Sequence, residues 1–133
     1  MSALADEIAE GYQFFARRHG IVAQAIRPAI EAALTLAGSS RREALDEADE
    51  IASVFYGFAR HPRCFPHAFR AMTTLLALAE ARKANLCVNA TDVEFGTLCI
   101  DVASNAVGFS DVCAWFAERL EPINVRVGLS VVS

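Results

Sequence analysis

Two stretches of helical periodicity, joined by a short segment with two prolines, constrain the fold of this chain more than any other feature. Across residues 40–60, apolar side chains recur at spacings of three and four, namely Ala44, Ala48, Ile51, Phe55 and Phe58. Residues 65–83 repeat the pattern with Phe65, Phe69, Met72, Leu76 and Ala79. Two helices with matching stripes and a hinge at 61–67 predict a packed helical hairpin.

Polar residues and prolines predict where these two helices begin and end. Ser40 and Glu43 have the spacing of a capping box, so we expect the first helix to start at Ser40. Pro62 disfavours helical dihedral angles at His61 and so ends that helix. Pro66 suits the first position of the second helix, because the amide proton that it lacks has no helical partner there.

Two helices are expected before the hairpin. Residues 2–18 and 21–37 both carry apolar side chains at helical spacing. Pro28 lies inside the second of these stretches. The sequence therefore predicts either a kink at Pro28 or a helix that begins there.

Another helix is expected after the hairpin. A short extended stretch at 86–90 leads to Thr91 and Glu94, which again have the spacing of a capping box. We expect a helix from there to Gly108. Residues 94–102 also fit the alternation of a β-strand, which is the alternative interpretation of this segment.

The C-terminal part carries the clearest strand pattern. Ser110 is expected to cap a last short helix that Pro122 ends. Residues 123–132 then alternate apolar and polar side chains, which predicts a strand. Residues 86–89 could pair with part of this strand, but they are too few to pair with all of it. The sequence as a whole predicts a single domain, residues 1–133, with a mainly α fold: a compact bundle of five to six helices with a C-terminal β-strand.

The composition is rich in apolar residues. The hydrophobic fraction of the 133 residues is 54% and the mean hydropathy is +0.31, which predicts a large core or a buried subunit interface. No uninterrupted apolar run approaches the roughly 18 residues of a membrane span. Residues 1–10 carry Asp6, Glu7 and Glu10, unlike a signal peptide, so we expect a cytoplasmic location and no membrane partner.

The charge balance is acidic, with a net charge of −4 and a pI of about 5.3. Because nucleic-acid binding needs a concentrated basic face, no nucleic-acid partner is expected. The carboxylates of residues 43–50 are expected to form a solvated helix face. The four cysteines form no Cys-x-x-Cys pair, and we expect them to be small buried hydrophobic residues.

The hinge holds a cluster of side chains that bind metals in other proteins. His61, Cys64 and His67 lie within seven residues, and imidazole and thiolate are ligands for Zn²⁺, Cu⁺ and haem iron. A fourth ligand would have to come from elsewhere, for example from Cys87. The alternative interpretation is structural: His61 at a helix end, Cys64 in the core and His67 on the surface.

No phosphate-binding, dinucleotide-binding, serine-hydrolase or zinc-protease motif occurs in the sequence. We therefore expect a non-enzymatic interaction or assembly module that acts through an apolar surface, as a homodimer. Val125, Val127 and Leu129 are expected at the interface, because the same strand in a second copy closes the open strand edge. Pairing with a different protein is the other option for that strand. The second interpretation of the function is a sensor of a small molecule, metal or haem at the hinge, and the third is a small enzyme.

Overall fold

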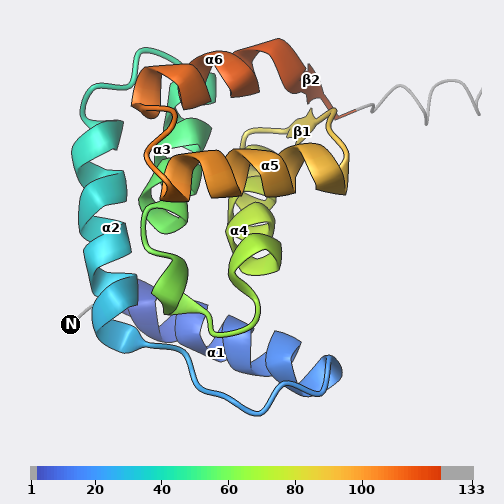
Figure 1. Ribbon diagram of the computed structural model, residues 1–133. Helices are drawn as coiled ribbons and strands as arrows, with labels where there is room; N and C mark the ends of the chain where they lie inside the picture. The colour runs from blue at the N-terminus through green and yellow to red at the C-terminus, as the bar shows by residue number, and fades with distance from the viewer. Residues whose placement is uncertain (1–2, 124–133) are drawn as a thin grey trace, which may run out of the picture.

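The chain folds into α-helices packed around a central helix, with one short sheet at the side (Figure 1). The computed structural model describes residues 3–123. The helices are α1 (Ala3–Arg18), α2 (Arg27–Arg41), α3 (Glu47–Ala59), α4 (Phe69–Lys83), α5 (Asp92–Ala103) and α6 (Phe109–Arg119), with a 3₁₀ turn, η1 (Pro62–Cys64), between α3 and α4. Strands β1 (Leu86–Val88) and β2 (Leu120–Pro122) form the sheet. The predicted mainly α bundle is confirmed.

Helix α3 is the centre of the bundle and contributes to two hydrophobic clusters. One cluster joins Phe58, in the last turn of α3, to α1, α2 and the hinge, and it includes Ile8, Tyr12, Ile30, Phe65 and Met72. The other joins Ile51 and Phe55 of α3 to α4, α5 and α6, and it includes Ala77, Phe95, Val102, Val112 and Phe116. Eight of the thirteen residues of α3 are buried, because helices cover it on several sides.

The predicted helical hairpin is present, with α3 packed against α4, but the predicted start of its first helix is wrong. Ser40 is buried in the last turn of α2, which continues through Gly38 to Arg41. Helix α3 begins after Asp46, whose side chain accepts a hydrogen bond from the backbone N–H of Asp49 at 3.0 Å. Packing of α2 against α3 outweighs the weak helix propensity of glycine and serine, so the helix does not stop at Gly38.

The second helix of the hairpin begins later than Pro66. Pro66 lies in a turn, and the next residue, His67, has a positive φ of 64° that no α-helix contains. The Tyr12 hydroxyl donates a 2.6 Å hydrogen bond to the carbonyl oxygen of Pro66 and so fixes this turn against α1. Helix α4 therefore starts at Phe69.

The segments on either side of the hairpin follow the predictions more closely. Helix α2 begins at Arg27 with Pro28 in its first turn, which confirms the second of the two expectations for Pro28. The capping box of Thr91 and Glu94 is confirmed, and residues 94–102 are helical rather than extended. Helix α5 ends at Ala103, earlier than Gly108, and the backbone then turns through Asn105 at a φ of 65°.

The last helix begins after Gly108, and not at a Ser110 cap, because the Asp111 carboxylate accepts the Gly108 N–H at 3.0 Å. Helix α6 ends before Pro122, since residues 120–122 already form β2. This strand pairs antiparallel with β1, and Leu86, Cys87 and Val88 face Pro122, Glu121 and Leu120. Of the strand predicted at 123–132, Ile123 donates its N–H to the Asn85 carbonyl at 2.9 Å, and the remaining residues lie outside the described part of the chain.

Candidate functional site

The three candidate metal ligands of the hinge face different surroundings. His61 follows α3, and its Nδ1 lies 2.7 Å from the carbonyl oxygen of Gly57, which makes it a cap for the end of that helix. Cys64 is fully buried in the cluster around Phe58 and Phe65. His67 is exposed. Within residues 3–123, the structure contains no group of three His, Cys, Asp or Glu side chains placed to hold a metal ion.

The four cysteines differ in exposure, and the three that are buried or half-buried have unreactive thiols. Cys64 and Cys99 are buried, Cys113 is half-buried and Cys87 is exposed, so only part of the set behaves as expected. Burial raises the pKa of the Cys64 and Cys99 thiols to about 12. Burial, followed by a hydrogen bond to Asp49, raises the pKa of Cys113 to about 12. These three thiols are protonated at neutral pH, and a protonated thiol is a poor ligand and a poor nucleophile.

Elemental analysis of the purified protein tests the metal prediction directly. A site at His61, Cys64 and His67 predicts about one equivalent of metal in protein prepared without chelator, and Cys64→Ser should remove it. Binding would also require Cys64 to leave the core. Metal-free protein whose unfolding is unchanged by chelator would leave the three side chains with the structural roles described above.

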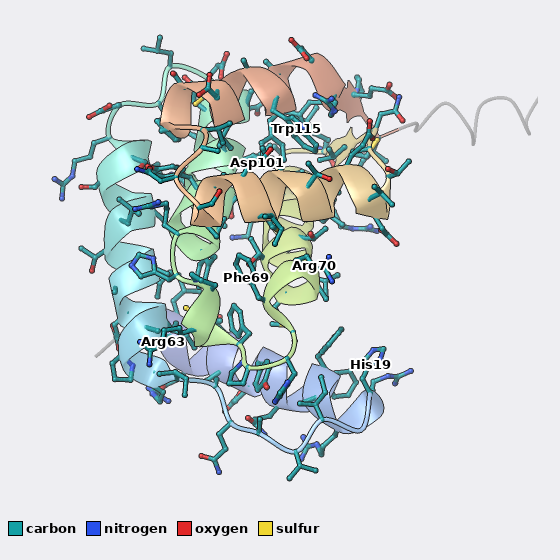
Figure 2. The ribbon with its side chains drawn as sticks, in the orientation of Figure 1. His19, Arg63, Phe69, Arg70, Asp101 and Trp115 are labelled. Atoms are coloured by element: carbon teal, nitrogen blue, oxygen red, sulfur yellow. The ribbon has the colours of Figure 1, made fainter. Side chains whose placement is uncertain are left out.

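An apolar hollow lies on the surface beside the hinge. It measures about 1070 Å³ and is bounded by α4, α5, the hinge and the C-terminal half of α1. Figure 2 shows Phe69 and Arg70 of α4 close to α5, which carries Asp101. Three large apolar side chains in the wall of this hollow are well exposed: Leu75 at 47%, Val93 at 77% and Ile100 at 51%. We refer to this feature as the α4–α5 hollow.

The α4–α5 hollow exists because both helices carry a second stripe besides the one in the core. On α4 the outer stripe has the spacing i, i+3, i+4, i+7 and consists of Ala71, Thr74, Leu75 and Leu78. On α5 the same spacing gives Val93, Gly96, Thr97 and Ile100. The inner faces hold the core residues Met72, Ala77, Phe95, Leu98 and Val102. A helix that is apolar on two sides has a face left over for a partner.

The charged groups of the α4–α5 hollow are Arg70, Asp92 and Asp101. None of the ion pairs in the described part of the chain includes any of them. The stem of Arg70 lies over Gly96, where a Cβ atom would come 3.5 Å from the arginine Cδ. One unpaired cation and two unpaired carboxylates at the edges of an apolar surface favour a partner that carries both signs of charge.

A second hollow, of about 620 Å³, lies among α1, α2, α3 and α4. Arg41 crosses its rim, with guanidinium nitrogens 3.4 Å from a Glu50 oxygen and 3.2 Å from a Glu80 oxygen. Lys83 is 3.4 Å from the other oxygen of Glu80. Four of the five charged groups that line this hollow are paired within the molecule, the exception being Glu47, whereas those of the α4–α5 hollow form no ion pair in the described part of the chain.

Comparison with models of known protein families finds no match, and a search of curated protein sequences finds none either. No helix in residues 3–123 is long and apolar enough to cross a membrane.

The sequence predictions located the hinge but missed the α4–α5 hollow beside it. Leu75, Leu78, Val93 and Ile100 were visible as apolar residues that fall outside the core stripes. Apolar residues at helical spacing outside the core stripe of a helix are the sequence signal that predicts such an outer stripe. The predicted interface residues, Val125, Val127 and Leu129, lie outside the described part of the chain.

Proposed function

We propose that this protein is a non-enzymatic interaction module that forms a homodimer through an apolar surface centred on the α4–α5 hollow. The observation that carries the proposal is the outer stripe on each of the two helices, with Leu75, Val93 and Ile100 left exposed. Removing such apolar surface from water is favourable by about 25 cal/mol for each Å², and this free energy favours association. The expected cytoplasmic location belongs to the same proposal.

The charges of the α4–α5 hollow support a second copy of the chain as its occupant. In a two-fold arrangement, Arg70 of each copy would form an ion pair with Asp92 or Asp101 of the other copy. Such a surface is complementary to itself, because it carries both signs of charge around an apolar centre. The apolar excess of the composition, 54% hydrophobic residues, fits a chain that buries surface on dimerisation.

The C-terminal segment belongs to the proposed interface as a sequence-based prediction. The described chain ends at Ile123, which is bonded to Asn85 at the end of α4. Ten further residues, 124–133, follow it. We retain Val125, Val127 and Leu129, which are among them and lie outside the described part of the chain, as predicted interface residues.

Sedimentation equilibrium on two matched variants tests the proposal. Ile100→Asp places a carboxylate in the α4–α5 hollow and should raise the dissociation constant of the dimer by at least about tenfold. Leu45→Asp makes the same kind of change at a residue that is 91% exposed in the α2–α3 loop, and it should leave the constant unchanged. Equal constants for the two variants would place the dimer interface elsewhere, and a monomeric wild-type protein would contradict the proposal.

A further inference from the structure

Positive charge gathers in two stretches of the sequence that contain no carboxylate. Residues 11–30 and 51–79 hold six arginines and all three histidines, but no Asp or Glu. The remainder of the chain holds the other six basic residues and all 16 acidic residues. The protein of net charge −4 therefore carries +6 in these two stretches and −10 elsewhere.

The fold brings parts of the two stretches together at one end of the molecule. The backbone N–H of Ile26 donates a 3.0 Å hydrogen bond to the carbonyl oxygen of Cys64, and Tyr12 bonds to Pro66. Figure 2 shows His19 and Arg63 at this end, toward opposite sides of the molecule. Helix α1 also brings three carboxylates to this end: Asp6, which is paired with Arg27, and the exposed Glu7 and Glu10. Arg17, Arg18 and Arg63 are exposed and form no ion pair in the described part of the chain.

An extended segment, residues 21–26, joins α1 to α2 across this same end (Figure 1). Its exposure alternates: Val22, Gln24 and Ile26 are exposed, while the three residues between and before them are half-buried. Val22 is 99% exposed. No backbone N–H or C=O group of residues 22–25 forms a hydrogen bond within the described chain. An extended segment with unpaired backbone groups is a template for another strand.

We propose that residues 21–26 are a docking edge for an acidic, extended peptide segment of a partner protein, which adds to them as a β-strand. Unpaired amides and carbonyls of residues 22–25 supply the ladder, and Val22 and Ile26 contact apolar side chains of the incoming strand. Carboxylates of that strand pair with Arg17 and Arg18 near one end of the edge and with Arg63 near the other. This surface is distinct from the α4–α5 hollow and is independent of dimerisation.

The backbone of this edge favours a peptide over the other anionic partners. A membrane surface or a nucleic acid would also be attracted by the three free arginines, since that attraction depends only on charge. Neither of them, however, supplies alternating N–H and C=O groups at the spacing of a strand. A second copy of this same edge is disfavoured, because it would bring like charges together.

Titration with designed peptides tests the proposal on the full-length protein. The probe is an eight-residue peptide of alternating Val and Glu, and binding is followed by calorimetry and by amide hydrogen exchange at residues 22–25. We expect binding together with slowed exchange at these amides. The same peptide with Lys for Glu should bind at least about tenfold more weakly, and so should one whose backbone nitrogens are methylated. Equal binding of the methylated peptide would overturn strand addition, as would preferential binding to anionic vesicles without slowed exchange.

Charge-reversal variants locate the site. Arg17→Glu and Arg63→Glu should each weaken binding of the Val–Glu peptide by about tenfold. Arg42→Glu, at an exposed arginine just after α2, is the matched control and should leave binding unchanged. An equal loss in all three variants would reveal nonspecific attraction and overturn the proposal. Because Arg17 and Arg63 are not part of the α4–α5 hollow, the dimer constant of these variants shows independently whether the proposed function holds.

Discussion

Phe55→Ala is expected to lower the free energy of unfolding by about 3–5 kcal/mol. Phe55 is fully buried, and its ring centroid lies 5.5 Å from that of Phe116 and 6.2 Å from that of Phe95. Removing this ring therefore leaves a cavity at the point where α3, α5 and α6 meet. Urea denaturation followed by far-ultraviolet circular dichroism measures the change, as a shift of the midpoint at constant slope.

Phe14→Ala is the matched control for this prediction. Phe14 is 58% exposed on the outer face of α1, and Arg18 lies 5.5 Å from its ring centroid. Loss of this exposed contact should cost less than about 1 kcal/mol. A loss below about 1 kcal/mol for Phe55→Ala as well would show that the aromatic cluster is not the core of the fold.

Gly57→Ala is expected to destabilise the protein by about 2 kcal/mol or more, although alanine favours a helix over glycine by about 1 kcal/mol. Helix α3 packs tightly against α2 at Gly57. A Cβ atom there would lie 2.6 Å from the carbonyl oxygen of Ala33 and 2.9 Å from the Cβ of Ala37. Since the first of these atoms belongs to the α2 backbone, the two helices would have to move apart.

Gly38→Ala provides the opposite expectation within the same helix pair. Gly38 lies inside α2, and nothing is within 4 Å of a Cβ atom built at this position. The substitution should therefore raise the unfolding free energy by about 0.5–1 kcal/mol. Thermal or urea unfolding of the two variants side by side measures both effects. A stabilising effect of Gly57→Ala would contradict the close approach of α2 and α3.

The sequence predicted the helices better than their ends, for a physical reason. Apolar periodicity over ten or more residues reports which face a helix buries, and this identified the hairpin and the helices around it. The ends depend on competition between alternative caps. Ser40 and Asp46 are both good N-cap residues. In the structure Ser40 lies inside α2, which packs against α3, and Asp46 is the N-cap of α3. His67 and Asn105 adopt positive φ values at two other boundaries. Histidine and asparagine adopt this conformation more often than most residues, but only a minority of them do, so residue type alone does not locate these turns.

The candidate site was less predictable than the fold. The spacing of His61, Cys64 and His67 suggests that they converge, but periodicity cannot tell that Cys64 faces the core while His67 faces solvent. The α4–α5 hollow depends on residues separated by a loop and a strand, so its shape follows from the crossing of two helices. The sequence predictions also missed the two stretches that contain no carboxylate, because the overall net charge of −4 averages over the whole chain.

The molar mass of the intact protein in solution, measured by light scattering across a range of concentrations, tests the proposed homodimer most directly. The account predicts twice the chain mass of 14.4 kDa at high concentration, with Ile100→Asp shifting the population toward a single chain. A molar mass of one chain at every concentration would contradict the proposed homodimer.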